Sequence, residues 1–252
     1  MNYGLWMSAA GLATEVHRQD IIANNVANAE TAGFKADKAF TIERPAPEQP
    51  FGPGSSPDQL LTRLGGGVLA NDTWTDFSAG GLVDGGDLDL ALEGDGFFAV
   101  RDGEEIAFTR DGRFNRDRNG FLVDLDGRQV LSDRNRPIRL TEGSVQVSVD
   151  GIVSVVGAEG DTSQVGRLRI AAAPTDSLRK VGDNLYHAPA DVKIGSSSST
   201  SVLQGRYETS NVDPIRSMSD LIQSSRSVQA AARFIDFHDR MMELAVTRIA
   251  VG

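Results

Sequence analysis

The sequence has no cysteine, few histidines and no long apolar run. Without cysteine, the 252-residue chain cannot form disulfides, a thiolate nucleophile or a Cys-based zinc site. Its three histidines are too few for histidine-rich metal chemistry. No apolar run is long enough to cross a bilayer, and the first residues lack the basic-then-apolar order of a cleavable signal peptide. We therefore expect no cofactor, no metal, no direct membrane insertion and no general secretory export.

Acidic charge is concentrated in the middle of the chain. The formal net charge is −10, and residues 41–210 carry 17 Lys and Arg against 26 Asp and Glu, a net of −9. Such a segment repels nucleic acid and anionic membranes. The two ends are close to neutral, so they can pack side by side without a charge penalty. The sequence therefore argues against a nucleic-acid partner.

Both ends of the chain carry apolar residues in alternating three- and four-residue steps. At the N-terminus the pattern runs through Leu5, Ala9, Leu12, Val16, Ala23 and Val26. At the C-terminus it runs through Met218, Leu221, Ser225, Val228, Ala232, Ile235, Asp239, Met242, Val246 and Ile249. A sustained 3.5-residue repeat predicts two long helices with coiled-coil-like packing. The alternative is a pair of amphipathic helices that cap one domain.

Two segments without regular structure bracket the middle. Five prolines between Pro45 and Pro57 predict an extended linker, and the Ser-rich run 195–201 offers no apolar surface to bury. Between these segments, repeated Asp-Gly and Asn-Gly pairs are typical of hairpin turns. We predict an α+β fold with a mainly antiparallel β domain at 87–189, linker regions at 34–86 and 190–212, and a discontinuous helical domain at 1–33 and 213–252.

The predicted elements follow from local signals. Asp213 followed by Pro214 is typical of a helix start, since the carboxylate can cap free amides. Apolar or alternating runs predict strands at 88–92, 96–101, 106–110, 120–123, 129–131, 145–149, 152–156 and 168–172. Residues 175–181 predict a turn or a short helix.

Two acidic patterns suggest chemistry and also have structural interpretations. Asn115, Asp117, Asn119, Gly120 and Asp126 fall at positions of a calcium-loop pattern, but the expected first Asp and last Glu are replaced and the flanks predict strands. A hairpin turn rich in Asn, Asp and Gly is therefore the expected structure.

Paired carboxylates are the second pattern. Asp87 with Asp89, and Asp124 with Asp126, each place two carboxylates on one strand face, as a glycosidase could use and as a solvated strand commonly shows. These patterns leave two alternative functions open, a secreted β-rich carbohydrate-active enzyme and a calcium-binding adhesin module. The glycines at 65–67 lack the Lys-Ser/Thr continuation of a phosphate loop, so no nucleotide site is predicted.

Charged and polar residues within the predicted helices have packing roles in our interpretation. His17 and His238 are expected to pack at a helix seam or contact solvent. Arg226, Arg233 and Arg240 recur every seven residues and would line the last helix beside its apolar seam. They would form a solvated face or pair with acidic groups of a neighbouring chain.

Several segments resemble one known family. The segment Ile22–Asn28, followed by Thr31–Lys35, is similar to the N-terminal signature of the bacterial flagellar rod and hook proteins. The likeness continues through 88–98, 109–114 and 182–186, and through Glu208 with 210–214. The family-motif residues are Asn24, Asn25, Asn28, Gly33, Phe34, Ser210, Asn211 and Val212.

The resemblance implies a structural subunit and not an enzyme. It implies terminal helices packed in an inner tube with a β domain outside, and a rod protein more than a hook protein, because the middle has little room for an additional outer domain. Within the rod, the compact middle favours the proximal type over the distal type, although the tail from residue 226 lacks the Gln-Thr-Gln run expected in the family.

The implied partners are other flagellar rod and hook proteins, copies of the chain itself and the flagellar type III export apparatus. The implied location is the periplasm-spanning rod of the basal body. The residues expected at the assembly interface are Leu5, Ala9, Leu12, Val16, Ala23, Val26, Leu221, Val228, Ala232, Ile235, Met242 and Val246.

Overall fold

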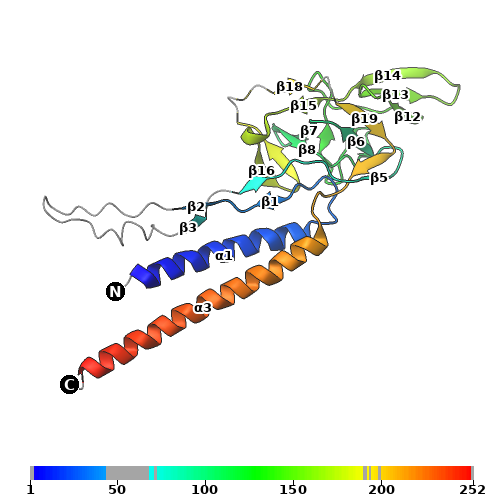
Figure 1. Ribbon diagram of the computed structural model, residues 1–252. Coiled ribbons are helices and arrows are strands. Elements are labelled where there is room, and N and C mark those ends of the chain that lie inside the picture. The colour runs from blue at the N-terminus through cyan, green and yellow to red at the C-terminus, as the bar shows by residue number, and fades with distance from the viewer. Residues whose placement is uncertain are drawn as a thin grey trace. The chain divides into compact units, whose positions relative to one another are not determined.

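A computed structural model describes residues 3–43, 68–70, 73–189, 192, 194–197 and 200–250 (Figure 1). The chain divides into two compact units. The helical unit comprises Met1–Ala27, Asp37–Asp76 and Asp213–Gly252, and the β unit comprises Asn28–Ala36 and Phe77–Val212. The fold is therefore α+β, as the sequence predicts, with the helices drawn from the two ends of the chain.

Two long helices form most of the helical unit. Helix α1 spans Tyr3–Ala27 and helix α3 spans Pro214–Ala250, and they lie side by side and antiparallel (Figure 1). Asp213 caps α3 as predicted, because its Oδ1 accepts the amide protons of Ile215 and Arg216 at 3.0 and 3.1 Å. At 1.5 Å per residue, the 37 residues of α3 extend about 55 Å. Neither helix has, within its described residues, a stretch apolar and uncharged enough to span a bilayer.

Short strand pairs complete the helical unit. Strand β1 (Asp37–Lys38) pairs with β4 (Trp74–Thr75), and β2 (Thr41–Glu43) pairs with β3 (Val68–Ala70), both antiparallel. The predicted proline-rich linker at 45–57 lies outside the described residues. The described part of the range 34–86 that we assigned to a linker thus contains short paired strands as well as irregular segments.

The β unit is an assembly of antiparallel strands. Its largest sheet has the order β16-β17-β8-β7-β11-β10-β9, and β15 pairs with both β7 and β18. Strands β12, β13 and β14 form a separate three-stranded sheet, while β19 pairs with β6 and β20 with β5. The bounds are β5 Leu82–Asp84, β6 Leu90–Glu93, β7 Phe97–Asp102, β8 Glu105–Thr109, β9 Asn115–Arg116, β10 Leu122–Val123, β11 Gln129–Val130, β12 Ser144–Val147, β13 Ile152–Val156, β14 Thr162–Arg167, β15 Ile170–Ala172, the 3-10 turn Thr175–Ser177, β16 Arg179–Gly182, β17 Leu185–His187, β18 Gly195–Ser196, β19 Ser201–Gln204 and β20 Arg206–Glu208.

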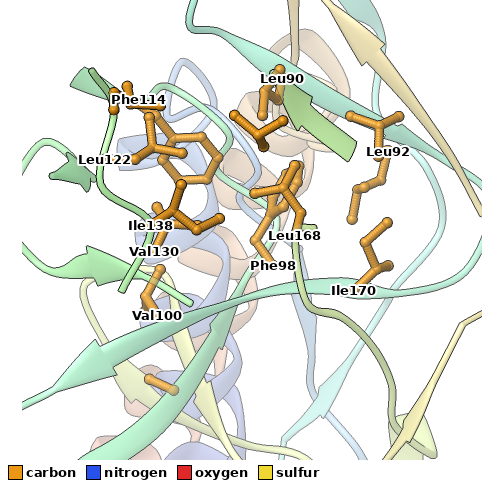
Figure 2. Packing of buried hydrophobic residues seen from close by; sticks show 14 of the residues in the cluster. Leu90, Leu92, Phe98, Val100, Phe114, Leu122, Val130, Ile138, Leu168 and Ile170 are labelled. Carbon is orange, nitrogen blue, oxygen red and sulfur yellow. The ribbon is translucent and has the colours of Figure 1, made fainter. Parts of the chain in front are cut away.

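Two clusters of buried apolar side chains form the core of the β unit. Figure 2 shows Phe98, Leu122 and Val130 from three strands converging in the first cluster with Leu168, which lies between β14 and β15. The rings of Phe98 and Phe114 meet edge to face with centroids 5.1 Å apart. A second cluster around Phe97, Phe108 and Tyr186 packs on the other face of β7. Alternating side chains of β7 therefore contribute to both clusters.

Candidate assembly site

The N-terminal family motif is held together by its own hydrogen bonds. Asn25, near the end of α1, is buried, and its side-chain amide exchanges two bonds with the backbone of Asp37, at 2.7 Å to the carbonyl and 2.9 Å from the amide. Asn28 accepts the backbone amide and the hydroxyl of Thr31 at 3.1 and 3.2 Å. Asn24 is exposed on α1. The Asn-rich stretch thus fixes how the chain leaves the helix.

Gly33 occupies a position that only glycine fits. Its φ is +67°, and an added Cβ would lie 2.4 Å from the amide nitrogen of Asp111 and 2.5 Å from the carbonyl carbon of Arg110. Both neighbours are backbone atoms, so a side chain would force the β unit apart locally. The close approach lets the Gly33 amide donate to the Glu208 carbonyl at 2.8 Å.

A buried ionic cluster lies beside this contact. Lys35 and Glu208 are 0% and 1% exposed, with Nζ 2.5 Å from Oε1. Oε2 of Glu208 accepts from Arg110 at 3.3 Å, and Oε1 also accepts the Gly80 amide at 2.8 Å. Backbone carbonyls of Ser78 and Gly94 accept further bonds from Lys35 and Arg110, at 2.7 and 2.8 Å. One carboxylate therefore neutralises two buried cations that come from distant parts of the chain.

The C-terminal family motif closes the same cluster. The Asn211 amide donates to the Phe34 carbonyl at 3.3 Å, and the Asn211 side chain accepts the Ala36 amide at 2.8 Å. Ser210 Oγ accepts the amide of buried Val212 at 3.2 Å. Lys180 sits over the buried Phe34 ring, with Nζ 3.8 Å from the centroid. We call Gly33, Phe34, Lys35, Arg110, Glu208 and Asn211 the motif junction.

The motif junction brings together residues about 175 positions apart in the sequence. Gly33, Phe34, Ser210, Asn211 and Val212 were singled out from the resemblance, and the structure places them in one region of the β unit. Arg110 and Lys180 were not singled out. A basic residue inside a predicted strand was the available signal for Arg110, since such a side chain needs a partner when the strand is buried.

Apart from half-buried Ser225, the less exposed residues on α3 form one row, which we call the inner row. They recur in alternating four- and three-residue steps, and Ser224 Oγ in this row lies 3.4 Å from the Glu15 carbonyl of α1. The row therefore faces α1. Its members are Ser217, Leu221, Ser224, Val228, Ala231, Ile235, His238 and Met242.

The predicted interface residues divide between this row and open surface. Leu221, Val228, Ile235 and Met242 belong to the inner row, whereas Ala232 and Val246 are exposed. On α1, Leu12 and Val26 are half-buried, and the exposed residues are Ala9, Val16 and Ala23. Leu5 lies in α1, but its side chain is outside the described residues. The coiled-coil geometry predicted for these helices stays a prediction.

Helix α3 also carries large apolar side chains that face solvent. Ile215, Met218 and Ile222 each lie one residue after an inner-row position of the heptad, and are exposed. Near the other end of the helix, four exposed apolar residues each lie one residue before such a position, while exposed Val246 lies one residue after one. Since each residue turns the helix by 100°, the two groups lie on opposite flanks of the inner row. The second group, which we call the outer row, is Phe234, Phe237, Met241 and Leu244.

The heptad arginines form a solvated helix face, one of the two alternatives considered, but they do not lie beside the inner row. Arg226, Arg233 and Arg240 are exposed, and each is two residues away from an inner-row position on either side. Two residues correspond to about 200° of rotation, so the arginines line the side of α3 opposite to α1 rather than a side next to the seam. His17 and His238 are half-buried within the helices.

The two acidic patterns form turns in the structure. Asp117 Oδ1 accepts the amides of Asn119 and Phe121 at 2.9 and 2.6 Å, within the hairpin that joins β9 to β10. Asp124 Oδ1 accepts the amides of Asp126 and Arg128 at 3.0 and 2.7 Å. Turn bonding therefore occupies these carboxylates, as the hairpin interpretation predicts. The described residues contain no group of three or more side chains placed to hold a metal ion.

The other carboxylate pair lines an open pocket. Asp87 and Asp89 border a cavity of about 510 Å³ together with Phe114, Asn115 and Arg116. Asp89 Oδ2 accepts the Gly86 amide at 2.7 Å, which closes a local turn. The Asp89 carboxylate therefore has a structural role, because it stabilises this turn.

Three protein-family matches cover the N-terminal, middle and C-terminal segments of the chain. The flagella basal body rod protein family matches residues 7–35, the flagellar hook protein FlgE/F/G D1 domain matches 91–155, and the flagellar basal body rod FlgEFG protein C-terminal family matches 203–248. A flagellar basal-body rod protein FlgF of Caulobacter vibrioides is 34% identical, and the alignment covers 99% of this chain and 98% of the relative. A flagellar basal-body rod protein FlgG of Bacillus subtilis is 31% identical, with 95% and 96% covered. The chain belongs to the flagellar basal-body rod family.

As a rod protein, the chain is a structural subunit of the flagellar basal body and not an enzyme. The N-terminal family match ends at Lys35, and the C-terminal match, over residues 203–248, includes Glu208. Each terminal match therefore reaches the motif junction. Relatives named FlgF and FlgG match to similar extents, so the proximal subtype stays a prediction.

Proposed function

We propose that this rod protein polymerises through its terminal helices, with copies of itself and with other rod and hook proteins, into a rigid helical tube. It is exported through the flagellar type III apparatus, without a cleaved signal peptide, and takes its place in the periplasm-spanning rod. Rigidity of the shaft, rather than turnover of a substrate, is the property that serves motility.

The exposed apolar residues of α3 carry this proposal. Phe234 and Phe237 are 66% and 60% exposed although α3 already packs against α1. A helix that needed only its intramolecular partner would place polar side chains there. Burying one such side chain contributes about 1.5–3 kcal/mol, so a few per helix, repeated around a tube, support a stiff shaft.

The predicted interface residues then take two roles. Leu221, Val228, Ile235 and Met242 support α3 against α1 within one subunit. The exposed residues contact neighbouring subunits, and the small ones permit close approach of helices. This second group comprises Ala9, Val16, Ala23, Ala232 and Val246, together with the outer row. Different faces meet different neighbours, so the contacts propagate along the tube instead of closing.

A pair of charge substitutions tests the division of roles. Phe237→Asp places a carboxylate on the outer row, where the isolated subunit leaves it in water. We expect normal unfolding of the purified subunit but loss of intact basal bodies and of swimming in soft agar, because the charge becomes buried and unpaired on assembly. Ile235→Asp, in the inner row, is expected to destabilise the helix pair in the subunit as well.

The control variant is Asp126→Ala, which alters the acidic pattern of the β unit and is expected to leave cells motile. Normal assembly and swimming of the Phe237→Asp strain would contradict the tube proposal. Loss of motility in Asp126→Ala, with the β unit folded, would contradict a purely structural role for that unit.

A further inference from the structure

Arginine side chains gather around one loop of the β unit. Asn135 is exposed and adopts a left-handed backbone conformation with φ 59°, in a turn where the Asn135 amide donates to the Ser132 carbonyl at 2.8 Å. Arg101 donates to the Asn135 carbonyl at 3.1 Å, and Arg169 donates to the Asn135 side-chain oxygen. Arg134 and Arg136 flank Asn135 and are exposed. We call these four arginines the arginine cluster.

In the described part of the chain, the arginine cluster forms no ion pair, although Asp133 precedes Arg134 in the loop. Among the residues that the structure describes, no carboxylate forms an ion pair with Arg101, Arg134, Arg136 or Arg169. Two of the guanidinium groups are instead held by neutral oxygens of Asn135, and burial lowers the pKa of Arg169 from its ordinary value. Arg101 and Arg169 are both bound to Asn135, and Arg134 and Arg136 flank it in the sequence, so positive charge collects at this loop. An acidic surface laid over the loop would reduce the mutual repulsion of these cations.

The opposite charge gathers around Arg128. Its guanidinium lies 3.5, 3.2, 2.6 and 3.0 Å from carboxylate oxygens of Asp102, Asp124, Asp126 and Asp183. One arginine thus faces four carboxylates, and Glu104 and Glu105 follow Asp102 at the tip of the β7–β8 hairpin, where both are exposed. We call Asp102, Glu104, Glu105, Asp124, Asp126 and Asp183 the acidic cluster.

Strand β7 places the two clusters on different sides of the β unit. Arg101 and Asp102 are consecutive in this strand, and consecutive side chains of a strand point to opposite faces. Arg101 contacts Asn135, whereas Asp102 contacts Arg128, in agreement with that alternation. One molecule therefore presents surfaces of opposite charge in different directions. Such surfaces can pair between copies in a head-to-tail manner without closing on themselves.

We propose that, in the polymer described under the proposed function, the arginine cluster of one subunit docks on the acidic cluster of the next subunit's β unit. This contact adds an electrostatic, β-to-β interface to the helical one. Its role is to favour one register between neighbours, because the opposite charges attract in that register and like-charged surfaces repel where they would meet. It weakens with salt to the extent that it stays hydrated.

Site-directed crosslinking tests the proposed neighbours. Because the native chain has no cysteine, only the introduced cysteines of this protein can react with the crosslinker. Cells producing both Arg134→Cys and Glu104→Cys full-length subunits would supply isolated basal bodies for treatment with a short bismaleimide crosslinker. We expect a crosslinked dimer in these basal bodies and none when either variant is the only one present. Intact basal bodies that contain both variants and give no dimer would overturn the β contact while leaving the helical tube in place.

Charge exchange provides the second measurement. Arg134→Glu combined with Arg136→Glu alters exposed loop side chains, and we expect the count of intact basal bodies to fall at least about tenfold while the purified subunit keeps its circular dichroism. Adding Glu104→Lys and Glu105→Lys to the same chain restores the opposite pairing, so the count should recover. Wild-type assembly of the arginine variant, or loss without recovery in the exchanged variant, would overturn docking between copies; the latter result would indicate a different acidic partner.

Discussion

The two units of this rod protein use large apolar side chains in opposite ways. In the β unit, Phe98 and Phe114 are buried and pack on each other. In the helical unit, Phe234 and Phe237 face solvent although α3 has a partner helix. The same residue type therefore stabilises the subunit in one unit and supplies surface for other chains in the other. The β unit is complete in one chain, and under the proposed function the helical unit is completed by its neighbours.

A matched pair of phenylalanine truncations tests this contrast most directly. Phe98→Ala is expected to lower the free energy of unfolding by about 3–5 kcal/mol, because it removes a ring from a closed core and leaves a cavity. Phe237→Ala is expected to change it by less than about 0.5 kcal/mol, since the ring is mostly hydrated. Urea unfolding followed by circular dichroism measures both. Equal losses in the two variants would remove the distinction between the units.

The buried ionic cluster offers a second test within the β unit. Glu208→Gln leaves Lys35 and Arg110 without a counter-charge, and we expect a loss of about 3–5 kcal/mol in the free energy of unfolding. The double variant Glu208→Gln with Lys35→Met removes one of the uncompensated cations and should recover part of that loss. A double variant less stable than Glu208→Gln alone would show that the cost does not arise from buried charge.

The glycine of the motif junction gives a smaller effect. Gly33→Ala combines a positive φ with a backbone clash, and at least about 2 kcal/mol of stability should be lost. Gly103→Ala is the control, because its φ is +60° but nothing lies within 4 Å of the added Cβ. Thermal unfolding compares the two. An equal cost at both positions would mean that the close approach of Gly33 to Arg110 does not matter.

Capping of α3 gives the smallest of these effects. Asp213→Ala removes the acceptor of two helix amides, and we expect a loss of about 1 kcal/mol in the stability of the helical unit. Asp220→Ala, at an exposed position inside the helix, serves as the control. The difference in helical circular dichroism on heating measures the cap. If Asp213→Ala and Asp220→Ala lose helical signal equally, the Asp213 cap does not stabilise the start of α3.

Local signals in the sequence predicted both terminal helices and eight of the strands, while the other strands, most of them short, were not predicted. The Asp213–Pro214 helix start is confirmed, and strands occur near each of the eight predicted positions. The strand β14, Thr162–Arg167, was missed because its residues are mostly polar and exposed, so no hydrophobic period marks it. It is a strand because it pairs with β13, which is a property of the sheet and not of the segment.

The helix faces show where sequence periodicity reaches its limit. Leu221, Val228, Ile235 and Met242 belong both to the repeat and to the inner row. The residues between them differ: the repeat has Met218, Ser225, Ala232 and Asp239, whereas the inner row has Ser217, Ser224, Ala231 and His238. Apolar residues flank this row on both sides, so the sequence supports more than one seam. The position of α1 decides which residues face it.

The sequence by itself determined the long terminal helices, the hairpin turns and the family, because each depends on residues close together in the chain or on motifs in a fixed order. Only the tertiary structure decided that Lys35 and Arg110 share Glu208, and that arginines and carboxylates collect on different sides of β7. These partners are separated by tens to well over a hundred residues. Their meeting depends on the closing of the whole β unit, which no local pattern encodes.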